Sequence, residues 1–337
     1  MTSLFQRHSQ FYWPADTEQA SGQAVDISSW SLSGNFDPYA EGTRDKFTLR
    51  CPADTAYPFL IPKHRYMYKK TFQRKTHIFH EQFWVEIAAY KIGRALGVEV
   101  PPAFVACREM PSSGAYEYAS LSEWFYDYPG APAAVVDRGG NLMSRLIPDY
   151  DRDKGKQHNF TTISDLFEGL EVENWREKWA RMLLFDALIG NTDRHQENWD
   201  VVSHFGRRSV LRENLSPAYD NGTAMGYEVL ADKISVKIRD MDLYISKGRH
   251  HLKWHIEDAA QAKHFDLLRL LLDTYPQAKL AMAEILARNI DPVCEDIYGL
   301  SRFDVINPAY KLSPERADFM IALLRARHRK ATETVGR

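Results

Sequence analysis

The feature that most constrains this chain is an apolar helical run that ends in a polar loop, LLFDALIGNTDRHQEN at residues 183–198. Gly190 is well placed to end the helix. The loop after it contains three side chains of chemical interest, Asp193, His195 and Asn198. A second polar turn, PAYDNG at residues 217–222, contains Asp220. This is the minimum set of a phosphotransferase: one aspartate orients the acceptor hydroxyl, while the asparagine and the second aspartate hold magnesium.

A simpler explanation is that Asp193 and Asn198 only cap a helix and form a turn, as such residues often do. Two observations weigh against it. The spacing is that of a kinase catalytic loop, in which a base aspartate is followed five residues later by a metal-binding asparagine. The loop also lies between a long expected helix and an expected hairpin whose far end reaches Asp220. We therefore favour a phosphotransferase site.

Composition indicates a folded protein and excludes some classes of function. Hydrophobic residues make up 44% of the 337 residues, enough for a sizeable core in one large domain or two. A net charge of −2 argues against a mainly electrostatic nucleic-acid or membrane binder. The three scattered cysteines, Cys51, Cys107 and Cys294, suit a reducing compartment. With no signal peptide and no membrane span apparent, we expect a soluble cytoplasmic protein without direct nucleic-acid binding.

The first part of the chain has the element order of a kinase N-lobe. Alternating side chains predict strands, and an apolar stripe at helical spacing predicts a helix that Gly97 would end. In order, the expected elements are strands at 46–50 and 65–70, a helix at 81–96, and extended segments at 98–107 and 116–124.

The remainder of the chain is predominantly helical. Prolines and glycines in 127–160 mark the boundary between lobes. The expected elements after it are helices at 163–170, 173–189, 257–274, 277–289 and 313–330, and a hairpin formed by 199–202 and 209–211. The predicted fold class is α+β, a bilobed protein-kinase-like fold with an N-lobe at 1–126, a hinge and inter-lobe segment at 127–160, and a helical C-lobe at 161–337.

Several segments together resemble the HipA-like kinases, a family of bacterial serine/threonine kinases. GNTDRHQENW followed by LSPAYDNGT resembles their catalytic and metal-binding loops. HRYMYKK resembles the strand with the ATP-contacting lysine, and FWVEIAAYKIGRALGVEVP resembles the helix and strand that follow it. IPDYDRDKGKQHNF and GRHHLKW resemble segments of small stand-alone members. The DRHxxN pattern also occurs in phosphatidylinositol kinases.

The resemblance implies a role for each loop residue. Asp193 becomes the catalytic base or the group that orients the acceptor hydroxyl, and Asn198 and Asp220 become the magnesium ligands. His195 follows the aspartate instead of preceding it, and YDNG replaces the Asp-Phe-Gly triplet of common protein kinases. A structural role for His195, bracing the loop, and a chemical role both remain open.

The lysine that contacts the nucleotide phosphates is one of two neighbours. Lys69 and Lys70 point to opposite faces of a strand, so only one can face the cleft. Lys69 aligns better with the family strand and is our choice, although an exposed edge lysine is the alternative. Glu86 is chosen as its carboxylate partner, with Glu81 as the rival. A solvated carboxylate on the helix face is the simpler explanation for either.

A nucleotide lid and a basic segment complete the expected site. The lid resembles the Gly-x-Gln-Pro-Lys segment of the family and consists of Gly42, Thr43, Arg44, Asp45 and Lys46. Its glycine permits close approach to phosphate, and Arg44 or Lys46 could pair with it. The family implies autophosphorylation in this loop, with Thr43, Ser31 and Ser33 as candidates.

The segment KGRHHLKW contains adjacent histidines, His250 and His251, whose side chains diverge and so do not suggest a metal site. We consider it either a basic patch for a substrate or a phosphorylated loop, or a surface turn anchored by Trp254.

The expected function is that of an ATP- and Mg-dependent serine/threonine protein kinase capable of autophosphorylation. Protein as the acceptor is implied by the resemblance alone, as is an antitoxin or regulatory partner of the toxin-antitoxin type. One alternative is a lipid or small-molecule kinase that resembles phosphatidylinositol kinases. A second is a catalytically inactive kinase-fold binding module, against which the complete set of Asp193, Asn198 and Asp220 argues.

Overall fold

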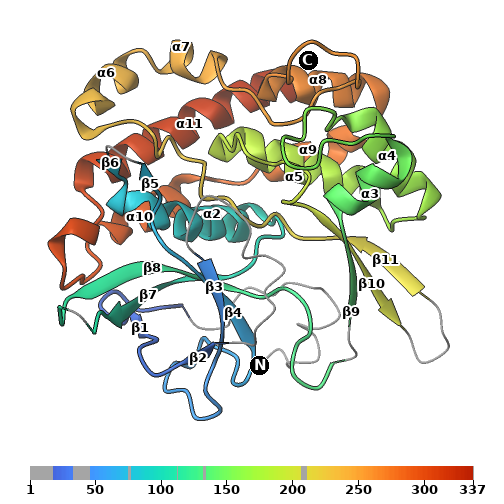
Figure 1. The fold of residues 1–337 in the computed structure, drawn as a ribbon. Coiled ribbons are helices and arrows are strands. Elements are labelled where there is room, and N and C mark those ends of the chain that lie inside the picture. Colours follow the sequence, from blue (N-terminus) through green and yellow to red (C-terminus); the bar gives the residue numbers. More distant parts are fainter. Residues whose placement is uncertain are drawn as a thin grey trace.

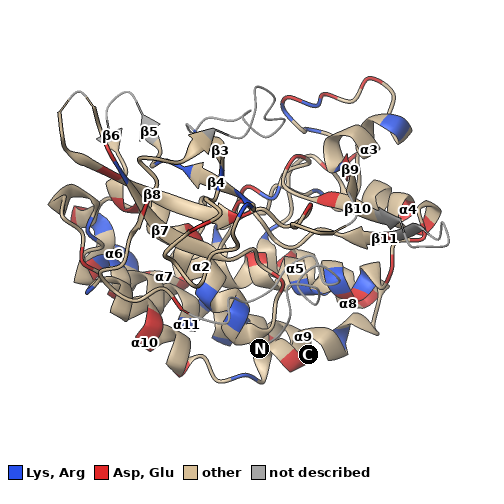
Figure 2. Cartoon of the chain, turned by 90° about the horizontal axis from the view of Figure 1, so that it is seen from below, with Lys and Arg blue, Asp and Glu red and all other residues tan. Residues whose placement is uncertain are grey.

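The computed structural model describes residues 18–32, 46–74, 77–111, 113–131, 134–205 and 211–336. It confirms the α+β fold class, with a sheet-rich N-terminal part and a helical C-terminal part (Figure 1). Lys and Arg are interspersed with Asp and Glu along the outer helices (Figure 2). Among the helices of the described ranges, none combines the length and the apolar character that crossing a membrane requires.

The N-terminal part is built on a six-stranded sheet in the order β1-β7-β8-β4-β3-β2. Its strands are β1 (Val25–Asp26), β2 (Ser31–Leu32), β3 (Lys46–Arg50), β4 (Arg65–Lys69), β7 (Ala103–Glu109) and β8 (Tyr116–Glu123). β1 and β7 are parallel, and the other pairs are antiparallel. β3 and β4 pair in a register that puts Lys46 opposite Lys69. This pairing brings two cations to the same end of the sheet.

Helix α2 (Phe83–Leu96) connects the sheet to the rest of the molecule. It packs against β7 and β8 on one side and α10 on the other, which explains why most of its residues are buried. The 3-10 turn η1 (His80–Gln82) precedes α2, and the short hairpin of β5 (Gln73–Arg74) and β6 (His77–Ile78) lies before it. Gly97 ends α2 in the left-handed conformation, as the sequence predicts. The predicted order of strand, strand, helix, strand, strand is confirmed.

The segment 127–160 contains regular structure that the sequence analysis did not predict. Strand β9 (Ala134–Arg138) pairs with β10 in a three-stranded sheet, β11-β10-β9, and α3 (Gly139–Leu146) follows directly. The two glycines that indicate a loop are needed for packing. A Cβ atom on Gly139 would lie 2.4 Å from Trp199, and one on Gly140 would lie 2.0 Å from Glu197. Close approach to residues 196–199 therefore explains the Gly-Gly pair.

The C-terminal part surrounds a central helix, α5 (Trp175–Ile189), which is buried on most sides because α8, α9 and α11 pack around it. The other elements are α4 (Phe160–Gly169), β10 (Asp200–Phe205), β11 (Leu211–Leu215), η2 (Ala231–Lys233), α6 (Ile234–Arg239), α7 (Met241–Ser246), α8 (His264–Thr274), α9 (Ala278–Leu286), α10 (Asp291–Leu300), η3 (Pro308–Tyr310) and α11 (Pro314–Gly336). The hairpin predicted after the catalytic loop is confirmed as β10 and β11.

The helical predictions differ from the structure in several places: α8 begins later than expected, and α3, α6, α7 and α10 were not predicted. α8 begins at His264 rather than at residue 257, because the preceding backbone pairs elsewhere: Ala262 N–H donates to Leu252 O, and His250 N–H donates to Ala262 O, both at 2.9 Å. α10 has Pro292 in its first turn. Proline is tolerated there because its missing N–H costs no helical hydrogen bond.

Candidate active site

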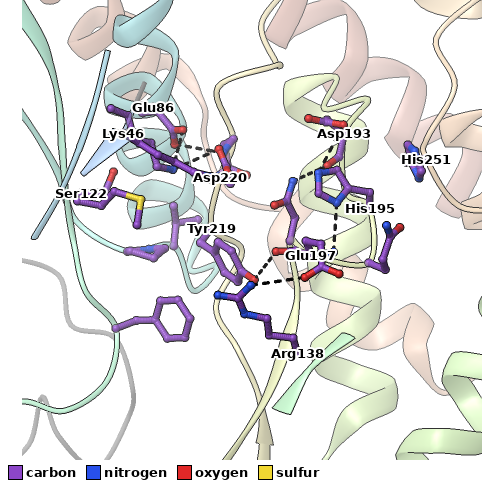
Figure 3. A pocket seen from close by; sticks show the side chains of 18 of the residues that line it. Lys46, Glu86, Ser122, Arg138, Asp193, His195, Glu197, Tyr219, Asp220 and His251 are labelled. Carbon is purple, nitrogen blue, oxygen red and sulfur yellow. Dashed lines mark hydrogen bonds and ion pairs between the residues drawn. The ribbon is translucent and has the colours of Figure 1, made fainter. Parts of the chain in front are cut away.

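A cavity of about 540 Å³ lies where the sheet meets the helical part (Figure 3). Its lining includes seven of the residues that the sequence analysis selected: Lys46, Lys69, Glu86, Asp193, His195, Asn198 and Asp220. They come from β3, β4, α2 and the two polar loops on either side of the β10–β11 hairpin. Segments separated by more than half the chain are therefore brought to one site.

Lys69 is at the centre of an ion-pair cluster. Its Nζ lies 3.1 Å from Glu86 Oε1 and 3.2 Å from Asp220 Oδ1, and the residue is only 5% exposed. Lys70 points to the opposite face of the sheet, where its Nζ lies 3.4 Å from Glu117 Oε1. The alternation of side chains along β4 thus gives the two neighbouring lysines different surroundings.

The structure also shows which of the two candidate glutamates pairs with Lys69. Glu86, in the first turn of α2, is buried, and its second oxygen accepts a hydrogen bond from Asn221 N–H at 3.1 Å. Glu81 instead accepts a 2.7 Å hydrogen bond from Ser313 N–H and lies 3.4 Å from Arg316 Nε. It joins η1 to the start of α11 and does not contact Lys69.

Asp220 is the third member of this ion-pair cluster. Its backbone is in the left-handed region, with φ of 54°, which aspartate tolerates better than most residues. Lys46 Nζ lies 3.7 Å from its Oδ2 (Figure 3). The other four lid residues, Gly42, Thr43, Arg44 and Asp45, lie outside the described residues, and so does the candidate phosphorylation site Ser33. Ser31 is exposed in β2.

The polar loop at residues 191–198 is held together by hydrogen bonds to its backbone. Asn191 Oδ1 accepts from Asp193 N–H at 3.0 Å, and Asp193 O accepts from Asn198 Nδ2 at 2.7 Å. The Asp193 side chain is 43% exposed and lines the cavity. His195 Nδ1 accepts from Glu197 N–H at 3.1 Å, and its Nε2 lies 3.9 Å from Asp193 Oδ1. His195 thus braces the loop and also neighbours the aspartate.

Several site residues received no role from the sequence. Arg194, which lies between Asp193 and His195 in the sequence, is fully buried, and its Nη2 lies 2.9 Å from Oδ1 of Asp186 in α5. Burial alone would raise the pKa of Asp186, but the Arg194 guanidinium and a hydrogen bond with His250 hold this pKa well below its usual range. The available signal was an aspartate inside the apolar run LLFDALI, which requires a buried partner.

The adjacent histidines diverge, as expected. His250 is buried, with its Nε2 3.1 Å from Asp186 Oδ2. His251 lines the cavity with its ring 5.7 Å from that of His195, and burial is the main cause that lowers its pKa to about 4. Trp254 is buried and stacks on Phe160 at 4.3 Å. Across the described ranges, His, Cys, Asp and Glu side chains form no group of three or more that could hold a metal ion.

The segment between the predicted lobes also contributes to the cavity wall. Arg152 donates two hydrogen bonds to Glu197, Nε to Oε1 at 2.7 Å and Nη2 to Oε2 at 2.9 Å, and Arg138 Nη1 lies 3.7 Å from the same carboxylate. The ring of Tyr219 stacks on Phe125 at 5.1 Å, while its hydroxyl donates to Glu197 O. Sequence reasoning found none of these contacts.

The fold and the cavity between its two parts define a kinase-like architecture. Residues 39–291 match the HipA-like C-terminal domain, and the chain belongs to this family, which confirms the predicted resemblance. A putative kinase, Y4dM of Sinorhizobium fredii (strain NBRC 101917 / NGR234), is 29% identical over 141 residues. That match covers 40% of this chain and 32% of the relative, so the chain matches about a third of the relative's length.

One solved structure supports the same fold. The Helicobacter pylori proinflammatory kinase CtkA superposes with a TM-score of 0.68 at 15% identity, covering 93% of this chain and 96% of that chain. The Shewanella oneidensis MR-1 toxin-antitoxin complex of HipA, HipB and operator DNA aligns with a TM-score of 0.45 at 13% identity, covering 96% and 68%. The similarity to CtkA confirms the kinase-like fold along nearly the whole chain.

Proposed function

We propose that this protein is an ATP- and Mg-dependent kinase that transfers the γ-phosphate of ATP to a serine or threonine hydroxyl of a protein and phosphorylates itself. The observation that carries the proposal is the Lys69–Glu86–Asp220 cluster, in which Lys69 and Glu86 are buried and which shares one cavity with Asp193 and Asn198. Membership in the HipA-like family and the name of the putative kinase relative support it.

In this proposal the N-terminal part binds the nucleotide. Lys69 contacts the α- and β-phosphates and is oriented by Glu86, whose carboxylate lies 3.1 Å from its Nζ. Lys46, whose Nζ lies 3.7 Å from Asp220 Oδ2, also contacts the phosphates. Gly42, Thr43 and Arg44 stay predicted phosphate contacts from the sequence alone. The apolar part of the cavity lining, which includes Met67, Val100 and Pro101, offers a surface for the flat adenine ring.

The C-terminal part holds the metal and the acceptor. Asn198 and Asp220 supply oxygen ligands, the type that magnesium prefers, and the hydrogen bond from Asn198 Nδ2 to Asp193 O assigns the amide nitrogen to the loop and leaves the amide oxygen for a metal. Bound magnesium would neutralise charge on the phosphates. Asp193 orients the acceptor hydroxyl and accepts its proton. His195 keeps Asp193 and the loop in place.

Two further points of the proposal rest on the family. These are protein as the acceptor and an antitoxin or regulatory partner. A cytoplasmic location stays a prediction from the sequence. The division into 1–126, 127–160 and 161–337 also stays a prediction. A lipid or small-molecule acceptor and an inactive binding module remain the alternatives against which the experiment is designed.

Incubation with radiolabelled ATP and magnesium tests the proposal. Wild type should label itself or a protein in a lysate, and label in the lipid extract would favour the lipid alternative. Asp193→Asn should lower phosphate transfer about 10²-fold or more but still bind ATP, because the loop uses the backbone N–H and C=O of Asp193 for its hydrogen bonds. Asp220→Ala should lose magnesium-dependent binding. A wild type that neither binds ATP nor transfers phosphate would refute the proposal.

A further inference from the structure

One buried guanidinium lies between the two loops that carry the proposed metal ligands. Arg194 donates five hydrogen bonds: Nε to Asp186 Oδ2 at 3.0 Å, Nη2 to Asp186 Oδ1 at 2.9 Å and to Asn221 Oδ1 at 2.8 Å, and Nη1 to Asn198 O at 3.0 Å and to Tyr219 O. A guanidinium has five N–H groups. Every donor of Arg194 is therefore used.

One side of this arrangement is a fixed anchor. Asp186 belongs to the last turn of α5, and its Oδ1 also accepts from Asn191 Nδ2 at 3.0 Å. Its Oδ2 contacts His250 Nε2 at 3.1 Å. His250 Nδ1 accepts from Leu252 N–H, so Nε2 carries the proton and donates to Asp186. The carboxylate is thus surrounded by donors, which is the condition under which a buried ion pair is stable.

The other side reaches each part of the proposed catalytic machinery. Arg194 contacts the backbone carbonyl of Asn198, itself a proposed metal ligand, and that of Tyr219, the residue before Asp220. Asn221, whose side chain accepts from Arg194, donates its own N–H to Glu86 Oε2 at 3.1 Å. A continuous set of hydrogen bonds therefore connects α5, both polar loops and the partner of Lys69.

We propose that Arg194 is a positioning residue that fixes the two proposed metal ligands, Asn198 and Asp220, relative to each other and to the Lys69–Glu86 pair. This inference rests on the proposed kinase function. Arg194, which lies between Asp193 and His195 in the sequence, would act through the loops and not by contact with the nucleotide or the acceptor. Lysine cannot perform this task, because an ammonium group has three donors and no planar fork.

The test compares Arg194→Lys with Arg327→Lys. Arg327 of α11 is also buried, but among the described contacts its guanidinium donates to Ala187 O at 2.9 Å and its Nε has no partner. Both variants replace a buried guanidinium with an ammonium group, but only Arg194 contacts the two polar loops at the cavity. Asn221→Ala is a milder variant that removes one acceptor and keeps the backbone N–H to Glu86, in case Arg194→Lys does not fold.

Hydrogen exchange supplies a readout that needs no activity. Arg194→Lys should accelerate exchange in peptides covering both 191–199 and 217–223, whereas Arg327→Lys should leave 217–223 at the wild-type rate. Asn221→Ala should accelerate 217–223 alone. Exchange that changes in 191–199 but not in 217–223 in Arg194→Lys would overturn the inference, whether or not the protein proves to be a kinase.

Kinetics then separate positioning from general destabilisation. In Arg194→Lys, kcat should fall about 100-fold, because displaced reacting groups cost that much, and the magnesium concentration for half-maximal activity should rise about tenfold. ATP binding without magnesium should stay near the wild-type value. An unchanged kcat and magnesium dependence would refute the inference. A wild type that binds no ATP would instead refute the proposed function, and the exchange data would still decide the role of Arg194.

Discussion

Lys69, the last residue of β4, and Lys70, which follows it, offer a matched pair of perturbations. Lys69→Met should destabilise the protein and weaken ATP binding, whereas Lys70→Met should do little of either. Both substitutions remove one positive charge at neighbouring positions and keep a side chain of similar length. They differ only in which face of the sheet loses the cation.

The contacts set the magnitudes. Removing one partner of a buried ion pair costs about 3–5 kcal/mol. Lys46 remains 3.7 Å from Asp220 and Asn221 N–H still donates to Glu86, so we expect the lower end, about 3 kcal/mol. The pair of Lys70 with Glu117 is partly exposed and should contribute about 0–1 kcal/mol.

Nucleotide binding should separate the variants more clearly. A hydrogen bond to a charged group contributes about 1.5–3 kcal/mol, which corresponds to an increase in the Kd for ATP of roughly 10- to 150-fold in Lys69→Met. Urea denaturation gives the free energies of unfolding, and calorimetric titration at a temperature where both variants are folded gives the Kd values. Equal effects of the two substitutions, or a larger effect of Lys70→Met, would refute the assignment of Lys69.

The remaining predictions concern pH and packing. Burial lowers the pKa of His264 to about 3 and that of His251 to about 4. Since the unfolded chain binds these protons at about pH 6.5, the free energy of unfolding should decrease as the pH falls below about 6.5. His264→Asn should reduce this dependence of the unfolding free energy on pH, measured by urea denaturation. Gly139→Ala should destabilise by about 1–3 kcal/mol, because its Cβ would lie 2.4 Å from the Trp199 ring and 2.5 Å from the backbone oxygen of Gln196. Gly299→Ala, with open space in α10, should stabilise by about 0.5–1 kcal/mol in thermal unfolding. No difference between the two variants would contradict the packing argument.

Local patterns were enough to predict most elements around the site. Alternation located β3 and β4, and helical spacing together with Gly97 located α2, because these signals depend on neighbours along the chain. The family was also recognisable, since the two polar loops are short and contiguous. The glycines at 139 and 140 were misleading because glycine occurs both in loops and where close packing leaves no room for a Cβ atom, and the sequence does not distinguish the two cases.

What only the tertiary structure decided is which groups meet. Alternation shows that one of Lys69 and Lys70 faces the cleft, but the position of Asp220, far along the chain, decides which. Glu81 and Glu86 lie a few residues apart in the sequence, and only the fold gives them different partners. Glu81 contacts Arg316 of α11, and Glu86 contacts Lys69 of β4. Arg194 needs acceptors from α5 and both loops. Such contacts depend on burial and charge pairing between distant segments, which no local spacing encodes.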